Sequence, residues 1–395
     1  MRRSLFLLIV LCKIGTSSAS NGTDSTQILL LNLQVQIEAT QALNDMYNYK
    51  FDRAEMQFRW LKQKYGWHPL PYFLLGLSQW WKMVPNIDNT EYDAEFMAYM
   101  DTSLVLSERL YEENNEIEGA FFLAATHGFV ARLESDRGNW TRAAIAGKNA
   151  LKYVDIVREN TDFSPEVLFG DAIMNYYTEW IRDNYPVLKP IMWFFPRGDM
   201  EKGLEQLDEV AHNAFYTRTE AQYYLMRILA NEQNEYHKAF SIAYYLRQTY
   251  PDNAYFHRFF MSILYRLGRF NALERESLQA LERIDSGMVG YEAVSGRYAS
   301  YYIAQMNEAR GQVTEAKLYY NSTIQFAIQS DHLDSWYAII SNLQLGTIAF
   351  KEGEDELSKK HLEMVIEYGN GKKEYQKKAK ELLKELYRRN RRNFR

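Results

Sequence analysis

Apolar residues recur at intervals of three and four along most of this chain, a spacing that predicts amphipathic α-helices. The segment 216–252 shows the pattern clearly. One apolar stripe ends at the polar pair Asn234-Glu235, and a second begins at Tyr236. Pro251 ends the second stripe, because proline cannot continue a helix. The segment is therefore predicted to be a helix, a tight turn, a second helix and another turn.

The same order of elements recurs at other places in the chain. A small residue stands early in the second helix of each predicted unit, after a glycine or polar residue that ends the first helix. These small residues are Ala54, Ala143, Gly203, Ala239 and Ala316. We expect them where two antiparallel helices approach most closely. No single hairpin can bury its apolar stripe, so seven or eight hairpins, covering most of residues 35–368, should stack on one another.

The unit from Tyr223 to Pro251 resembles the tetratricopeptide repeat (TPR) family. It carries Tyr236, Ala239 and Leu246 in its second helix, but Arg227 where the family usually has glycine. Most other units depart from the family's 34-residue period, so the first half is a divergent array. The resemblance implies an all-α, right-handed superhelical solenoid of stacked antiparallel helix hairpins. It implies very little about the ligand.

Composition and the positions of proline, glycine and charged residues suggest five segments. The expected segments are a signal peptide (1–20), a divergent N-terminal helical-repeat half (21–184), a Pro/aromatic link (185–197), C-terminal TPR-like repeats (198–371) and a basic capping helix with a tail (372–395). A short run from Phe169 to Leu204 is similar to the Iml2/tetratricopeptide-39 group, from which we carry over no function. The link holds Trp193-Phe194-Phe195 and could be a hinge, an exposed binding loop or a hydrophobic plug. A plug is favoured, because exposed aromatic surface invites aggregation.

The N-terminus has the pattern of a secretory signal. Arg2 and Arg3 precede a short apolar run, and Ser18-Ala19-Ser20 supplies small residues for cleavage near Ser20. We expect export to a bacterial periplasm or to the cell surface. An uncleaved anchor and a lipoprotein modified at Cys12 are the alternatives, although large residues precede Cys12. Cleavage would remove the only cysteine, which leaves no disulfide and no thiol nucleophile.

Charge is unevenly distributed. The formal net charge is −5, yet residues 372–395 carry eleven Lys or Arg and three Glu. Such a tail could touch an anionic membrane surface peripherally, or it could be a solvated capping helix, which is favoured. The rest of the chain is acidic, so a nucleic-acid partner is not expected.

Motifs for catalysis are absent from the sequence. HExxH, CxxC, GxSxG and GxxxxGK do not occur, and no two of the seven histidines are three or four residues apart. We therefore expect no catalytic residue, no metal site and no cofactor, and thus not an enzyme. An enzyme on an α-helical array remains a lower alternative, because paired carboxylates can lie far apart in the chain.

The TPR resemblance also implies a concave groove lined by the first helix of each hairpin. Tyrosine and arginine, which often anchor recognition surfaces, are frequent at the corresponding positions. The groove residues expected on this basis are Tyr224, Asn231, Arg258, Tyr265, Tyr298, Tyr301, Gln305 and Glu308. They favour a protein or peptide partner, bound as an extended segment or a helix. A glycan-binding role, as in SusD-like proteins, is the alternative because stacked tyrosines suit sugar rings. The tyrosines could also simply fill wide gaps between helices.

Overall fold

The computed structural model describes residues 28–113, 115–158 and 164–393, and the expected signal peptide lies outside this part. Within it the chain forms eighteen α-helices and no strand, which confirms the expected all-α class. Two short segments extend or link the helices: a 3-10 turn, η2, and a π-helical turn, η3.

Consecutive helices pair into hairpins along the chain. The elements up to residue 213 are α1 (Leu33–Tyr47), α2 (Phe51–Tyr65), α3 (Leu70–Met83), α4 (Asp93–Glu113), α5 (Glu116–Asp136), α6 (Trp140–Arg158), α7 (Val167–Asn184) and α9 (Met200–Asn213), with η2 (Pro186–Leu188) and α8 (Lys189–Met192) between α7 and α9. The later elements are α10 (Arg218–Arg227), η3 (Ile228–Glu232), α11 (Tyr236–Thr249), α12 (Ala254–Arg266), α13 (Phe270–Asp285), α14 (Ala293–Ala309), α15 (Val313–Gln329), α16 (Trp336–Glu352), α17 (Asp355–Tyr368) and α18 (Lys373–Asn393).

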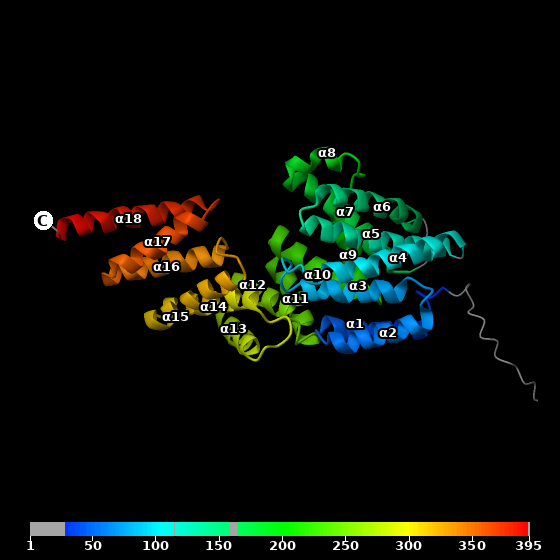
Figure 1. Ribbon diagram of the computed structural model, residues 1–395, viewed down its shortest axis with the longest axis horizontal. Coiled ribbons are helices and arrows are strands. Elements are labelled where there is room, and N and C mark those ends of the chain that lie inside the picture. The colour runs from blue at the N-terminus through cyan, green and yellow to red at the C-terminus, as the bar shows by residue number, and fades with distance from the viewer. Residues whose placement is uncertain (1–27, 114, 159–163, 394–395) are drawn as a thin grey trace, which may run out of the picture.

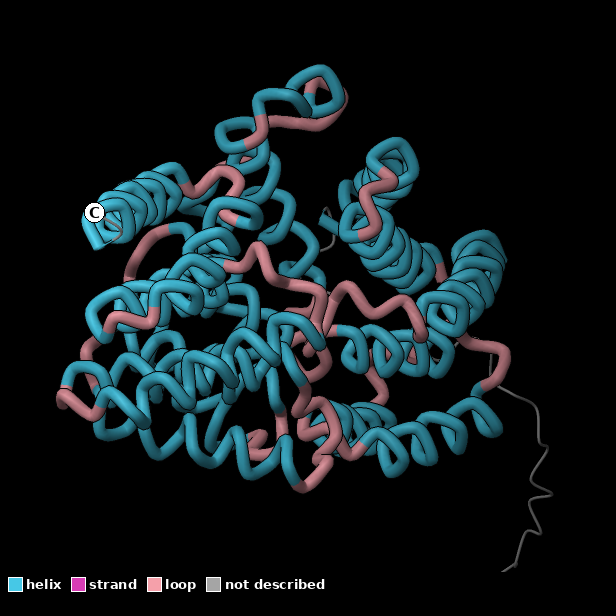
Figure 2. Tube along the Cα trace, turned by 60° about the vertical axis from the view of Figure 1, so that its left-hand side comes forward, coloured by secondary structure: helices cyan, strands magenta, loops and turns pink. Residues whose placement is uncertain are grey.

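Helices that are neighbours in sequence are also neighbours in space. Each helix packs mainly on the one before it and the one after it, as in a helical-repeat array. Figure 1 shows the chain running from α1 and α2 through α10–α12 in the middle to α18 at the opposite end. The turned view in Figure 2 shows the same arrangement as helices joined by short loops.

The turns within hairpins follow the expected chemistry. Gly353 joins α16 to α17 at φ +82°, a left-handed conformation that glycine adopts without steric cost. Asn234, before α11, adopts the same region at φ +57°. At Gly203 the close approach is real, because an added Cβ would lie 2.8 Å from the backbone nitrogen of Tyr176. Ala143 departs from the pattern: it is only half-buried.

One continuous core runs through both expected halves of the chain. It extends from Leu29 in the first turn to Leu345 on α16. The end of α1 lies against the turn before α12, although about 200 residues separate them. There Asn253 donates its side-chain amide to the carbonyl oxygen of Tyr47 over 2.7 Å, and the Tyr250 hydroxyl donates to Asn44 Oδ1 over 2.9 Å. The N-terminal hairpins therefore fold back onto the middle of the array.

The link at 185–197 is not a plug, so that expectation is wrong. η2 and α8 project from the body next to α7 (Figure 1). The side chains of Trp193 and Phe194 are 88% and 72% exposed. The link is held through its backbone instead, because Arg182 donates to the carbonyl oxygens of Met192 and Phe195 at 2.9 and 2.6 Å.

The basic C-terminal segment forms the last helix. α18 buries Ala379 and Leu383 against Ile339 and Leu362 of the preceding hairpin and leaves its charged side exposed. Within the described residues, no helix combines the length and apolarity needed to cross a bilayer.

Candidate functional site

A groove lined by arginine and tyrosine follows the first helices of three successive hairpins and reaches a fourth. Its larger part has a volume of about 550 Å³ and is formed by α10, η3, α12, α14 and α16. An adjoining part of about 230 Å³ shares Arg227, Tyr255 and Arg258 with it and extends to Trp80 on α3 and Arg132 on α5. We call the two parts together the Arg/Tyr groove.

The arginines of this groove have few acidic partners. Arg258 is 8% exposed and donates to Ser295 Oγ over 3.2 Å. Arg297, next to Tyr298 on α14, is not itself part of the groove lining; it is 5% exposed and donates to Ser330 Oγ over 3.4 Å, while its Nε has no hydrogen-bond partner. Arg227 donates to the hydroxyl of Tyr223 over 2.8 Å. In the described part of the chain, none of these three arginines has a carboxylate oxygen within 4.0 Å. A buried charge without a counter-charge is costly, so this cluster requires an explanation.

The groove carries a local excess of positive charge. Although burial alone would raise the pKa of Tyr223, the guanidinium groups of Arg227 and Arg132 lower it below its ordinary value. Burial and the neighbouring Arg258 lower the pKa of Arg297. Glu292 interacts electrostatically with Arg258, yet burial still raises the pKa of this carboxyl. Among the described residues of the lining, the acidic ones, Asp88 and Asp136, are outnumbered by four arginines, so positive charge is in excess.

Aromatic rings lie between the arginines. The Arg258 guanidinium lies 5.3 Å from the ring centre of Tyr255 and 5.7 Å from that of Tyr298. Arg297 lies 5.9 Å from Tyr298 on its other side. Arg227 lies 5.3 Å from the ring of Tyr223. Cation–π contacts of this kind stabilise a positive charge without cancelling it.

Four of the eight expected groove residues line this groove: Asn231, Arg258, Tyr265 and Tyr298. Asn231 lies in the π-helical turn η3, a feature that is frequent at functional sites. Neighbouring tyrosines surround the groove wall, and Tyr265 stacks on Tyr302 with ring centres 4.8 Å apart.

The other four expected groove residues lie elsewhere. Tyr301 is 1% exposed and packs between Trp336 and Tyr337, so it is a core residue. Tyr224 is also buried, and its hydroxyl accepts a hydrogen bond from Arg132. Gln305 and Glu308 bind the Tyr320 hydroxyl, where they link α14 to α15. The cause is the rotation of α10 and α14 about their axes, which turns Tyr224 and Tyr301 into the core while Tyr298 and Tyr302 face the groove.

Sequence reasoning missed three of the groove arginines. Arg227 had a signal, because it replaces the usual glycine of the repeat. Arg266 also lines the groove and adjoins the expected residue Tyr265, but it has no separate signal. Arg132 had no signal, since it comes from a hairpin about ninety residues earlier that folding brings to the groove.

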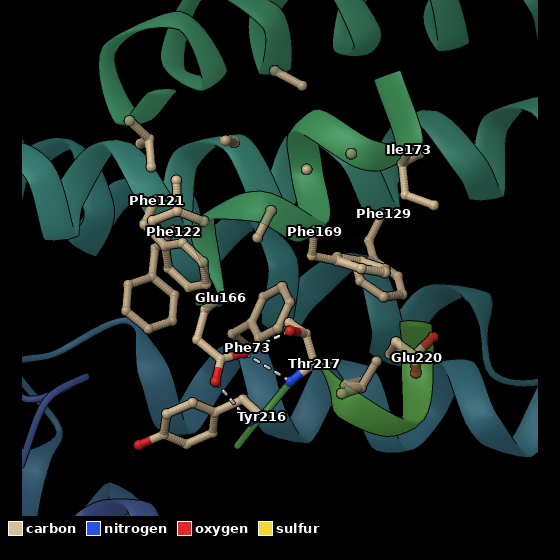
Figure 3. Close-up of a pocket in the computed structure, with 18 of the residues that line it drawn as sticks. Phe73, Phe121, Phe122, Phe129, Glu166, Phe169, Ile173, Tyr216, Thr217 and Glu220 are labelled. Atoms are coloured by element: carbon tan, nitrogen blue, oxygen red, sulfur yellow. Dashed lines mark hydrogen bonds between the residues drawn. The ribbon is translucent and has the colours of Figure 1, made fainter. Parts of the chain in front are cut away.

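A second feature lies beside this groove in the N-terminal half (Figure 3). It is a cavity of about 180 Å³ between α3, α5, α6, α7 and α10, which we call the apolar cavity. Its wall includes five phenylalanines: Phe73, Phe121, Phe122, Phe129 and Phe169. Arg132 lines both this cavity and the Arg/Tyr groove.

Two glutamates at the apolar cavity are already engaged. Glu166 accepts hydrogen bonds from the backbone nitrogens of Phe215, Tyr216 and Thr217 at 2.6, 3.0 and 2.9 Å, before the start of α10. It thereby satisfies donors near a helix N-terminus. Glu220 accepts from Trp81 Nε1 over 2.6 Å, and burial raises the pKa of this carboxyl to about 7.

No three His, Cys, Asp or Glu side chains gather to form a metal site in the described residues. No known protein-family model matches the sequence, and no curated protein is significantly similar to it.

Proposed function

We propose that this protein is a non-catalytic scaffold that binds an extended, acidic segment of a partner protein in the Arg/Tyr groove. The proposal rests on one observation: Arg227 and Arg258, on successive first helices, line a common groove, and neither has a carboxylate oxygen within 4.0 Å among the described residues. The chain would then be a TPR-like, right-handed superhelical solenoid. The pattern of its first 20 residues favours export to a bacterial periplasm or cell surface.

The charge of the groove favours an acidic ligand. Arg258 lines the groove and is buried, so its guanidinium group has already lost most of its hydration. A ligand carboxylate would supply the missing counter-charge, and charge-assisted hydrogen bonds to arginine are short and strong. The free-energy cost of removing water from the buried guanidinium group is therefore already included in the folding of the free protein, and ligand binding does not add it.

The length of the groove favours a chain-like ligand. Arg227, Arg258 and Tyr298 come from α10, α12 and α14, so contacts are spread over three hairpins. Asn231 and Asn234 add amide groups at one end, which can bond to a peptide backbone. Tyr255 and Tyr298 supply aromatic surface beside each arginine.

Titration with defined peptides tests the proposal. A short peptide that alternates Glu and Tyr should bind the purified chain, whereas the same peptide with Gln for Glu should bind at least about tenfold more weakly. The double variant R227Q/R258Q should lose this preference. The variant R275Q is the matched control, because Arg275 is an exposed arginine on α13 outside the groove.

Two outcomes would contradict the proposal. Equal affinity for the acidic and neutral peptides would show that charge does not select the ligand. Competition by neutral soluble glycans would favour the carbohydrate-binding alternative. Arg266 is exposed at the groove edge, so R266Q tests whether charge selects the ligand without altering the core.

A further inference from the structure

The apolar cavity is kept open by small residues. Gly128 stands in the middle of α5, and a Cβ added there would meet no atom within 4 Å. At Gly170 on α7 an added Cβ would meet only Val154 Cγ2, at 3.7 Å. Glycine inside a helix costs about 1 kcal/mol relative to alanine. At both positions a larger residue would fit and stabilise the helix, yet the chain has glycine facing the cavity.

The cavity wall is suited to a hydrocarbon. Apart from a few polar groups at its edges, its lining consists of aliphatic and aromatic side chains. Figure 3 shows this lining running from Phe121 and Phe122 on one side to Phe129 and Ile173 on the other. An engineered apolar cavity of about 150 Å³ stays dry and binds benzene, so a cavity of this size and lining can hold an apolar group.

Of the described residues, Arg132 is the one basic side chain in the lining of the cavity. The carboxylate of Glu166 is occupied by three backbone donors and by the Thr217 hydroxyl. The Arg132 side chain is 22% exposed and donates to the hydroxyls of Tyr223 and Tyr224. Its ion pair with Asp136 is long, at 3.7 Å, and a ligand carboxylate could replace it. Arg132 stands where the apolar cavity meets the Arg/Tyr groove.

We infer that the apolar cavity binds the alkyl chain of a single-chain amphiphile whose carboxylate pairs with Arg132. The chain would lie among the phenylalanines, where apolar burial stabilises it, and the head would reach the water-filled groove. Arginine is suited to this role because its planar guanidinium can bind both carboxylate oxygens. Burial favours the protonated form of Glu220, the other acidic group beside Arg132, which limits repulsion of the ligand.

Binding of decanoate and of decanol to the purified chain, measured by calorimetry, tests this inference. The two probes share the chain and differ in the head. Wild type should bind both, and decanoate more tightly. R132Q should weaken decanoate at least about tenfold and leave decanol unchanged, since only decanoate uses the charge.

Substitutions at Gly128 test the location. G128L places a side chain in the cavity and should abolish binding of both probes while the melting temperature stays equal or rises. G128A is the matched control: it gains the same helix propensity but leaves the cavity open, so binding should persist. R227Q/R258Q should leave decanoate binding intact, because neither arginine lines the apolar cavity, and this separates the site from the peptide groove.

The inference is overturned if decanoate does not bind wild type, or if G128L binds it as well as wild type does. If R132Q loses decanoate binding and decanol binding equally, Arg132 is not the partner of the ligand's carboxylate. Uptake of free decanoate in the presence of phospholipid vesicles would identify a free fatty acid as the source. Extraction of whole phospholipid from the vesicles would overturn the inference, because a phospholipid is not a single-chain carboxylate.

Discussion

Trp81 on α3 donates its indole N–H to Glu220 on α10 over 2.6 Å, across 139 residues of sequence. Tyr47 on α1 donates to the same carboxylate oxygen over 3.2 Å. The bond therefore joins the first two hairpins to the middle of the array. It also places an acidic group in a fully buried position, which has a consequence for stability.

Replacing Glu220 with glutamine should stabilise the protein at alkaline pH. Burial raises the pKa of the folded-state carboxyl to about 7, above its ordinary value, so the folded chain holds a proton that the unfolded chain loses. That stabilisation is complete below the unfolded pKa and is lost as pH rises through 7. E220Q keeps an acceptor oxygen for Trp81 and Tyr47 and should gain up to about 3 kcal/mol at pH 8. Urea unfolding at pH 5 and pH 8 measures the difference in free energy of unfolding between E220Q and wild type. An equal difference at the two pH values would contradict the prediction.

Acid should destabilise the protein through His257. Burial lowers the pKa of this histidine to about 4, so it stays neutral when folded. The unfolded chain binds its proton near pH 6.5, hence stability falls as pH drops from about 6.5 to 4, by up to about 3 kcal/mol. H257Q should flatten this part of the stability curve in urea titrations at several pH values. An unchanged slope would show that another group, such as His361, carries the effect.

Removing the exposed aromatic side chains of the link should leave stability unchanged. Trp193 and Phe194 contribute little buried surface, so W193S/F194S should shift the free energy of unfolding by less than about 0.5 kcal/mol. F256A, at a fully buried position, should cost about 3–5 kcal/mol in the same assay. A comparable loss in the link variant would restore the plug interpretation.

The same substitution should have opposite signs at two glycines. Gly353 has φ +82°, where any side chain is strained, so G353A should destabilise by about 1–2 kcal/mol. Gly128 lies within a helix and faces open space, so G128A should stabilise by about 1 kcal/mol. The melting temperatures of G353A and G128A, each compared with wild type, test this prediction. Equal shifts in the two variants would contradict the local geometry described for these glycines.

Local pattern was enough to predict the helices, their pairing and the turn chemistry. Helical spacing of apolar residues depends on contacts three and four residues apart, and a left-handed turn depends on one residue such as Gly353 or Asn234. Half of the expected groove residues follow for the same reason, because Arg258 and Tyr298 occupy regular positions on first helices.

The sequence by itself thus determined the all-α class and the stacking of hairpins. Only the tertiary structure decided which turn of α14 faces the groove, why Tyr301 is buried, and how Arg132 joins Arg227 from a distant hairpin. Rotation of a helix about its axis is set by its neighbours, and the return of α1 onto α12 is set by packing between residues about 200 apart. Neither the rotation of a helix nor this long-range packing leaves a periodic pattern in the sequence. The apolar cavity and the charge of the groove therefore form only when the hairpins pack together.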